Sequence, residues 1–509
     1  MSQNSRTKNT LLSTFSNIFE QLIAMAFGLV VPRLVIKTYG PEVNGLTSFI
    51  QQILNVFQLL QAGMIGAAIF ELYKPIAEKA YDRINEIVNA TTKFFYRVGS
   101  IFAFLVLMVI PFILYRETDS MFRQWEIICA TVIMGLNGTL TFFFDARYDI
   151  IISSYQKRYI FSLSRIVNKC IYYILVILVI LFKKHFVLMY VSSLVAKCVY
   201  LLILRFTYKK LTKDWYRPIK EKINFKLKNR WYLLSNSIVF QLVTSLPYIL
   251  ISSQYDLTFT SVYSINYMIV NILKMLMLSF FHSVTEPFGN YNAMHTIKES
   301  SALFRKVQLG ILFITTVLAS CLICLNFSFI QIYTAKITDI QYAIPIFSFS
   351  LVFDFIFYTL YLQLNLIVDI FGLYKDIYRG VIGVGLVAIG VMSVLCKYCG
   401  IGYVPFAIAF FYLGLLIFYS LEICRKVKGF VNLTTLIAGV TILLTIVFCA
   451  KLVFALVPFA ISNLSEWLIV AIAVFCVSVL ISVFFYRLIF RTDFIILEKA
   501  IKNRLLHKR

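Results

Sequence analysis

Basic side chains interrupt several apolar stretches of this 509-residue chain, and their positions suggest a binding chemistry. Lys169, Lys197 and Lys274 lie deepest, within stretches that are each long enough to cross a bilayer. A charged side chain at mid-bilayer costs about 2.5–3.5 kcal/mol on insertion scales, and it faces a wet cavity or a partner. Ammonium and guanidinium groups attract anions such as phosphates. These residues therefore predict an anion-binding cavity inside a membrane.

The apolar stretches contain more bases than acids, six against two clear acids. The two acids are Glu20 and Asp354, and both are candidates for charge coupling. Each could instead pair with a lysine for purely structural reasons. Arg33 and Arg165 lie near segment ends, from which a long side chain can reach the headgroups. The excess of bases favours an anionic ligand, and its candidate cations are Arg33, Lys169, Lys197 and Lys274.

Polar side chains also recur at helical spacing within three of these stretches. Residues at i, i+4 and i+7 lie on one face of a helix, and a spanning helix offers them no water on its lipid side. We expect each face to point at protein or at a wet cavity, where amides and tyrosines suit sugars. The three sets are Gln51, Asn55 and Gln58; Tyr267, Asn271 and Lys274; and Asp354, Tyr358 and Tyr361, with Asn365 one turn further.

The sequence offers no pattern for catalysis or for a bound cofactor. Ten cysteines are mostly scattered singly, and the chain contains four histidines. Cys396 and Cys399 form the one close cysteine pair, and a metal would need further Cys or His ligands beside them. No nucleophile with an adjacent base and no phosphate-binding loop is evident in the sequence. We expect a protein that is not an enzyme, with no metal and no cofactor.

The composition is that of a polytopic membrane protein. The chain is 60% hydrophobic and 14% charged, with a mean hydropathy of +0.83, whereas a soluble protein has about 25% charged residues. The formal net charge of +24 fits basic cytoplasmic loops and anionic lipid better than nucleic acid. We therefore expect an all-α membrane protein with membrane lipid, and no nucleic acid, as a partner.

The apolar stretches predict about fourteen transmembrane helices, because a spanning helix needs about 20 apolar residues. Two six-helix bundles, followed by two C-terminal helices, would account for them. The expected spans are 11–36, 44–70, 94–115, 124–146, 159–182, 186–206, 231–253, 259–283, 305–330, 342–367, 377–397, 402–424, 431–456 and 465–489.

The distribution of basic residues predicts the orientation. With the N-terminus inside, the expected outer loops contain seven of the 48 Lys and Arg residues and the inner segments contain 35. This bias matches the positive-inside rule, so both termini are expected in the cytoplasm. The seven outer residues are Lys37, Arg116, Arg123, Lys183, Lys184, Lys336 and Lys397.

Four parts are expected along the chain. A six-helix bundle over 1–206 is followed by a basic cytoplasmic linker over 207–230, a second six-helix bundle over 231–424, and two further helices with a basic tail over 425–509. A shift of 220 residues aligns Gln21 with Gln241 and Thr38 with Thr258, and each bundle opens with a proline-containing helix. Such paired halves are typical of alternating-access transporters.

The segment 17–75 carries a resemblance to a known family. Two apolar runs in it are joined by a short turn that ends in Gly40 and Pro41. The run from Arg33 to Gly40, the glycine at 45, the segment 61–66 and the segment 72–75 together resemble the start of polysaccharide flippases. These are the Wzx-like, oligosaccharidyl-lipid members of the multidrug/oligosaccharidyl-lipid/polysaccharide exporter superfamily.

The resemblance implies a function in polysaccharide biosynthesis. Such a flippase moves an undecaprenyl-pyrophosphate-linked oligosaccharide from the inner to the outer leaflet of the bacterial plasma membrane by alternating access. It is similar in kind to lipid II flippases, whose basic cavity receives the pyrophosphate. The candidate cations named above would then bind the diphosphate, and the polar stripes would bind the sugars. A glycan polymerase and glycosyltransferases of the same pathway are the implied partners.

Two other functions are weighed against this one. A small-molecule antiporter of the multidrug and toxin extrusion type has the same fold, but it exports organic cations and would need acids in its cavity. A membrane enzyme, either a glycan polymerase or an acyltransferase, would need a large outer loop or a membrane-embedded histidine. His282, with Glu286 one turn later, is the faint candidate for such a histidine.

Lys274 leads to the most specific hypothesis. It has no acid three or four residues away on its own helix, and a buried ammonium needs a partner. Asp354 is the expected partner. Substrate diphosphate would displace it, and the ion pair would form again after release. Substitution Lys274→Gln would then abolish transport in a protein that still folds.

Overall fold

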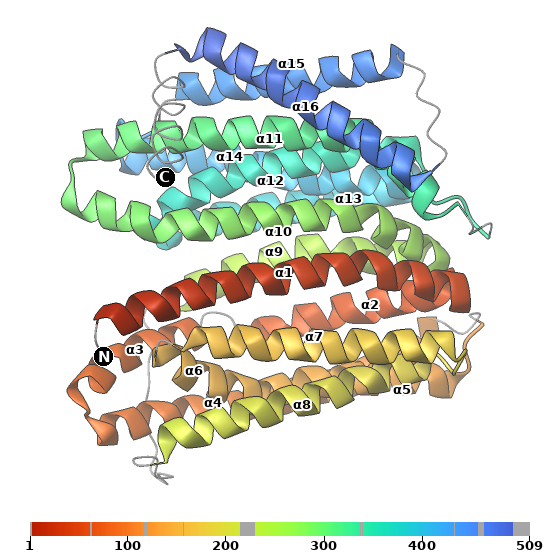
Figure 1. Cartoon of the computed structure of the whole chain (residues 1–509), viewed down its shortest axis with the longest axis vertical. Coiled ribbons are helices and arrows are strands. Elements are labelled where there is room, and N and C mark those ends of the chain that lie inside the picture. The colour runs from red at the N-terminus through yellow and green to blue at the C-terminus, as the bar shows by residue number, and fades with distance from the viewer. Residues whose placement is uncertain are drawn as a thin grey trace. The chain divides into compact units, whose positions relative to one another are not determined.

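The computed structural model describes residues 3–61, 64–116, 121–155, 157–213, 230–335, 337, 339–431, 433–456 and 463–491. Regular structure over these residues is entirely helical, as expected for an all-α polytopic membrane protein (Figure 1). Thirteen of the described helices are long and apolar enough to cross a membrane. The prediction of the fold class is confirmed.

Contacts divide the chain into two compact units, Met1–Ser261 and Val262–Arg509. The first unit therefore includes the helix over 230–254, which the sequence assigns to the second bundle. The predicted repeat of two six-helix bundles stays a prediction, and residues 214–229 of the predicted linker lie outside the described residues. The two units are described separately below.

The first unit contains nine α-helices and the first residues of a tenth among its described residues (Figure 1). Its main packing partners are α1 with α7, α7 with α8, α4 with α5, and α2 with α9. The elements are α1 (Gln3–Tyr39), α2 (Pro41–Phe57), η1 (Gln58–Gln61), α3 (Met64–Glu78), α4 (Tyr81–Arg116), α5 (Gln124–Leu140), η2 (Thr141–Asp145), α6 (Ala146–Ser154), α7 (Arg158–Leu181), α8 (Val187–Thr212), α9 (Arg230–Gln254) and the start of α10 (Leu257–Met294).

The predicted turn between the first two helices is present. Gly40 adopts a φ of 91°, which a residue with a Cβ rarely adopts, and Pro41 occupies the first position of α2. The Tyr39 hydroxyl donates to the Lys184 carbonyl at 2.6 Å and so ties the end of α1 to the α7–α8 connection. Gly45 lets α2 approach the start of α10, because a Cβ there would lie 1.9 Å from the Leu257 carbonyl oxygen.

The predicted span 44–70 is not one continuous α-helix in the described residues. α2 ends at Phe57, a 3₁₀ turn covers Gln58–Gln61, and α3 begins at Met64. The break lies beside a glycine at position 63, a residue that makes a helix interior about 1 kcal/mol less stable than alanine does. This segment accounts for the difference between the fourteen expected spans and the thirteen continuous candidates among the described helices.

The fourth predicted span, 124–146, is too short. A single span runs over Gln124–Ser154 and contains one π-helical turn, η2. Ile150, Ile151 and Ile152 extend the apolar run and are all buried. Asp145, which also falls inside the expected span 124–146, lies well within this candidate membrane span, and the prediction that Glu20 and Asp354 are the two clear acids in such helices is wrong.

The second unit packs its helices around α11 and α12. α12 packs on α14 and on α11, α13 packs on α14, and α15 and α16 both pack on α11. α12 begins with Pro345 and ends at Phe371, and the φ of 64° at the following Gly372 gives the left-handed cap that glycine favours. The elements are the rest of α10, α11 (Ile297–Tyr333), α12 (Pro345–Phe371), α13 (Tyr374–Tyr398), η3 (Ile401–Tyr403), α14 (Val404–Lys426), α15 (Leu433–Leu456) and α16 (Leu464–Ile489).

Candidate functional site

A polar cavity of about 360 Å³ lies within the first unit. α2, η1, α5, η2, α7 and α8 supply its walls. Among the described residues that line it, none is acidic, and Lys197 is the basic one. Most of the lining side chains are amides or hydroxyls. The polar lining residues are Thr47, Gln51, Gln58, Asn137, Thr141, Asn168, Tyr172, Tyr190, Ser193 and Lys197.

Hydrogen bonds between helices hold parts of this lining in place. The hydroxyls of Thr47 on α2 and Tyr190 on α8 lie 2.8 Å apart. The Asn137 amide of α5 donates to the Ser193 hydroxyl of α8 at 2.8 Å. Because these bonds join different helices, the polar groups are positioned before any ligand arrives, which lowers the ordering cost of binding.

The predicted stripe on α2 divides between two roles. Gln51 and Gln58 line the cavity, as expected for sugar contacts. Asn55 instead accepts a hydrogen bond from Gln51 at 2.9 Å and donates one to Gln52 at 3.3 Å. Gln52 in turn accepts from Ser245 of α9 at 3.0 Å. The stripe thus connects the cavity wall to α9.

Lys197 is paired with a carboxylate at the cavity wall. Its Nζ lies 2.9 Å from Asp145 Oδ2, and 13% of its side chain is exposed. The Tyr200 hydroxyl donates to the other carboxylate oxygen, Oδ1, at 2.5 Å. The ammonium also lies 4.7 Å from the centre of the Tyr200 ring, close enough for a cation–π contact. Both oxygens of Asp145 therefore have a donor from α8.

Lys169, predicted as a ligand for the diphosphate, has a different environment. Its Nζ lies 2.9 Å from Glu20 Oε1, and Arg165 Nε lies 3.0 Å from Glu20 Oε2. Glu20 thus joins α1 to two cations of α7. Lys169 is not among the residues that line the cavity, and this cluster carries a net positive charge on the α1–α7 contact.

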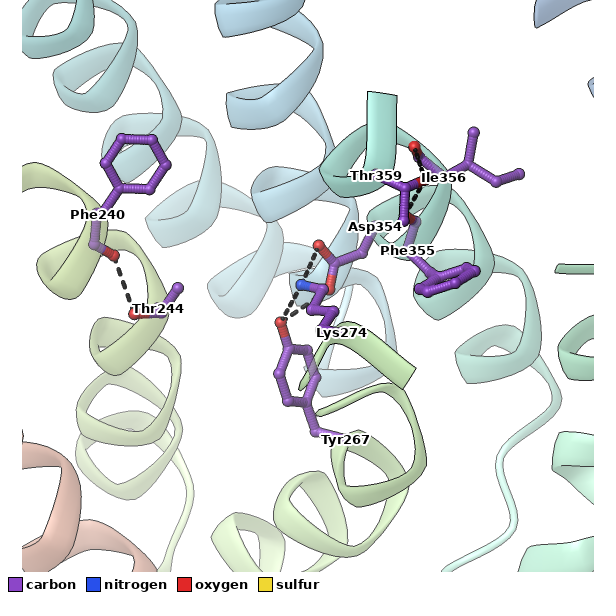
Figure 2. A network of polar contacts seen from close by, with 8 residues as sticks. All are labelled: Phe240, Thr244, Tyr267, Lys274, Asp354, Phe355, Ile356 and Thr359. Atoms are coloured by element: carbon purple, nitrogen blue, oxygen red, sulfur yellow. Dashed lines mark hydrogen bonds and ion pairs between the residues drawn. The ribbon is translucent and has the colours of Figure 1, made fainter. Parts of the chain in front are cut away.

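The second unit contains the ion pair that the sequence predicts for Lys274 (Figure 2). Lys274 Nζ lies 2.7 Å from both carboxylate oxygens of Asp354. The Tyr267 hydroxyl donates to Asp354 Oδ2 at 2.8 Å and accepts from Lys274 at 2.9 Å. Just 9% of the lysine side chain and none of the aspartate side chain is exposed. The prediction that Asp354 is the partner of Lys274 is confirmed.

Aromatic rings surround the Lys274 ammonium. The ring centres of Tyr267, Tyr358 and Tyr412 lie 5.2, 5.0 and 5.1 Å from Nζ. Each distance is within the range of a cation–π contact. Tyr361 packs its ring against Tyr412, with centres 5.6 Å apart. The ammonium therefore already has an acid and three rings as neighbours.

The predicted stripe on α12 continues as a hydrogen-bonded chain. The Tyr361 hydroxyl donates to Asn365 at 3.0 Å, and the Asn365 amide donates to Asp369 at 3.1 Å. Tyr374 of α13 donates to the same carboxylate at 2.6 Å. This chain runs along one face of α12 from buried residues to the exposed Asp369.

Arg33 and Asn271, also predicted as ligands, are not among the residues that line the cavity. Arg33 lies half-buried on α1, and Asn271 is exposed on α10. The side chains of His282 and Glu286, named for an acyltransferase, lie outside the described residues. Among the described residues, no three His, Cys, Asp or Glu side chains group closely enough to hold a metal ion.

Asp145 is the main residue that sequence reasoning missed. It lies one residue before the end of the expected span 124–146, and it is not named among the acids predicted within spans. The isoleucines at 150–152 were the available signal, because they extend the apolar run past the aspartate. Contacts such as Asn137 with Ser193 join helices far apart in the sequence, and helical spacing gives no information about them.

The fold is that of known membrane transporters. No protein family model matches the sequence, and no curated protein matches it either. Among solved structures, the chain is similar to transporters of the MOP superfamily, which has multidrug resistance MATE transporters among its members. At these low identities the similarity concerns the fold alone.

The similar solved structures are a lipid II flippase and MATE transporters. The lipid II flippase MurJ in an inward closed conformation has a TM-score of 0.65 at 16% identity, over 94% of this chain and 99% of MurJ. An inward-facing MATE transporter of the MOP superfamily has a TM-score of 0.63 at 11% identity, over 82% of this chain and 98% of that one. A MATE transporter in complex with MaL6 has a TM-score of 0.55 at 11% identity, over 84% and 97%.

Proposed function

We propose that this protein is a transporter that moves an undecaprenyl-pyrophosphate-linked oligosaccharide from the inner to the outer leaflet of a bacterial plasma membrane. The observation that carries the proposal is the lining of the cavity in the first unit. That lining combines amides and hydroxyls with the ammonium of Lys197, and none of its described residues is acidic. The similarity to a lipid II flippase is consistent with a lipid-linked substrate.

The chemistry of the cavity matches the two polar parts of such a substrate. Sugar hydroxyls both donate and accept hydrogen bonds, as do the amides of Gln51 and Asn168. A diphosphate is an anion that a lysine ammonium binds through charge-assisted hydrogen bonds. Basic inner segments favour an orientation with both termini in the cytoplasm. Polymerases and glycosyltransferases of the pathway would then supply and use the glycan.

The competing function is export of small organic cations by a MATE-type antiporter, which the same fold supports. An organic cation would need a carboxylate or an aromatic face in the cavity. Tyr172 and Tyr190 could offer such faces, but the cation facing the cavity is Lys197, which repels another cation. The charge of the lining therefore favours an anionic substrate.

A flipping assay tests the proposal against this alternative. The purified protein is reconstituted into vesicles with a fluorescent undecaprenyl-pyrophosphate-linked oligosaccharide in both leaflets, and an impermeant reductant is added. Bleaching of nearly all the fluorescence is expected, compared with about half in protein-free vesicles. Uptake of ethidium driven by an ion gradient, together with no flipping, would establish the antiporter instead.

Matched variants connect the activity to the cavity. The double substitution Gln51→Leu with Asn168→Leu should slow flipping roughly tenfold, since each lost hydrogen bond contributes about 0.5–1.5 kcal/mol. Gln254→Leu at the exposed end of α9 is the control and should flip at the wild-type rate. Equal rates for all three proteins would place the substrate elsewhere.

A further inference from the structure

A π-helical turn and an ion pair coincide at the wall of the polar cavity. η2 interrupts the span Gln124–Ser154 over Thr141–Asp145. Thr141, at its start, lines the cavity, and Asp145, at its end, pairs with Lys197 of α8. A π turn changes the register of side chains before and after it, and such turns are frequent at functional sites. Here the turn directs a carboxylate at the lysine that faces the cavity.

We propose that Asp145 competes with the anionic group of the substrate for Lys197. The proposal rests on the function proposed above and adds a control of release at the same site. When no phosphate group is bound, Asp145 holds the ammonium at the cavity wall. When a phosphate or diphosphate enters, its oxygens take over the hydrogen bond from Lys197. Asp145 recovers the ammonium when the substrate leaves.

The arrangement of the pair is suited to such an exchange. Lys197 lines the cavity and Asp145 does not, so an entering ligand meets the ammonium first. A lysine has three donors, and one of them is used on Asp145 at 2.9 Å. The carboxylate keeps its hydrogen bond from Tyr200 when the lysine turns away. Lys197 would then be paired with the phosphate, and the Tyr200 hydrogen bond would offset part of the cost of leaving Asp145 without a cation.

The lysine–carboxylate pairs of Glu20 and of Asp354 lack this combination. Glu20 bonds two cations at once, and neither Lys169 nor Arg165 is among the residues lining the cavity. Asp354 holds Lys274 through both oxygens in a setting of three tyrosine rings. Of these three pairs, Lys197–Asp145 is the one in which a lysine touches both an acid and the cavity.

Competition predicts opposite effects on binding when Asp145 is substituted and when its hydrogen-bond donor Tyr200 is substituted. Asp145→Asn removes the competing charge but keeps the side-chain shape and an acceptor for Tyr200. The ammonium becomes available to the substrate, so the dissociation constant for an anion should fall about tenfold, the effect of one competing charge-assisted hydrogen bond. Release should slow, so the flipping rate at saturating substrate should also fall.

Tyr200→Phe should have the reverse effect. The carboxylate loses its second donor and depends more on Lys197, so the dissociation constant should rise by about threefold, the effect of a weak hydrogen bond. The matched control is Asp149→Asn. Asp149 lies four residues after Asp145 and accepts a hydrogen bond from Ser153 at 2.5 Å, and its loss should leave binding unchanged.

The experiment measures binding of inorganic pyrophosphate and of the fluorescent lipid-linked oligosaccharide to the full-length protein in detergent, together with flipping in vesicles. Tighter binding by Asp145→Asn and weaker binding by Tyr200→Phe support the competition. Weaker binding by both variants overturns it, because Asp145 would then merely position Lys197. Thermal unfolding identifies a variant that does not fold. The direction in which the dissociation constant of the other variant changes then decides between these outcomes.

A double variant completes the test and separates it from the proposed function. In the background Lys197→Gln, the substitution Asp145→Asn should no longer tighten binding, because the group under competition is absent. Tightening that persists overturns the competition. If the wild-type protein flips the lipid-linked oligosaccharide, the proposed function stands whichever sign these variants give. If it neither binds pyrophosphate nor flips the lipid, both proposals fail.

Discussion

The Lys197–Asp145 pair of the first unit and the Lys274–Asp354 pair of the second unit have the same chemistry in different surroundings. Both join a lysine to an aspartate across two helices, at 2.9 and 2.7 Å. The first faces a cavity of amides and hydroxyls. The second has no exposed part of its aspartate and three tyrosine rings around its lysine. Surroundings, and not residue types, therefore decide which lysine a ligand can reach.

The cavities of the two units show the same contrast. A cavity of about 420 Å³ in the second unit lies among α11, α15 and α16 and is lined mainly by apolar side chains, such as Val453, Phe454 and Val477. In a membrane such a surface is compatible with lipid chains, whereas the polar lining of the first unit requires water or a polar ligand. The Lys197 ammonium thus lines a polar cavity, whereas the Lys274 ammonium is packed against tyrosines.

The largest expected effect follows from breaking the enclosed pair. Lys274→Gln leaves the Asp354 carboxylate buried with Tyr267 as its remaining donor. Removing one partner of a buried ion pair typically costs about 3–5 kcal/mol, so we expect a large fall in the thermal unfolding temperature in detergent. The double substitution Lys274→Met with Asp354→Leu leaves no orphaned charge and should recover most of that loss.

This prediction also decides the role that the sequence suggests for Lys274. A variant Lys274→Gln that unfolds at the wild-type temperature but does not flip the substrate would support the lysine as a diphosphate ligand. A destabilised variant whose stability returns in the double substitution would make the pair structural. In that case Lys197 of the first unit, and not Lys274, would be the lysine that binds the substrate.

The third pair should give an intermediate effect. Glu20→Gln leaves Lys169 and Arg165 without their carboxylate, but 28% and 37% of these side chains are exposed. Water can solvate both cations, and partly exposed ion pairs contribute about 0–1 kcal/mol. We expect a small loss of thermal stability and wild-type affinity for pyrophosphate. A loss of affinity as large as that of Lys197→Gln would show that this cluster belongs to the binding site.

The sequence was sufficient to predict the fold class and the two residues of the Lys274–Asp354 pair. Lys274 has no acid three or four residues away on its own helix, and Asp354 is an acid within an apolar run, so their pairing could be inferred from energetic cost alone. The helical period correctly grouped Asp354 with Tyr358 and Tyr361. These inferences succeeded because they depend on local spacing and on the free-energy cost of burying a charged side chain.

Other features depend on how distant segments pack, and they could not be predicted. The choice of Glu20 as the partner of Lys169 depends on the contact between α1 and α7. The π turn at 141–145 is one wide turn in a helix whose sequence has no glycine or proline there. The α-helix ends at Phe57 and continues as a 3₁₀ turn within a predicted span. Tertiary contacts override local preferences at such places.

The smallest expected effect compares one tyrosine from each pair. Tyr358 places its ring 5.0 Å from Lys274 Nζ, and Tyr200 places its ring 4.7 Å from Lys197 Nζ. Phenylalanine keeps the ring face that attracts a cation, so Tyr358→Phe should change stability by less than about 1 kcal/mol, while Tyr358→Leu should cost more because it removes a cation–π contact. Neither should change pyrophosphate affinity.

Tyr200→Phe also keeps the ring, yet it removes the hydrogen bond to Asp145 and should weaken binding. Titration of pyrophosphate against the three variants, with thermal unfolding in parallel, measures both effects. A change of affinity in Tyr358→Phe as large as that in Tyr200→Phe would mean that a ligand reaches both lysines, and the contrast between the two pairs would be wrong.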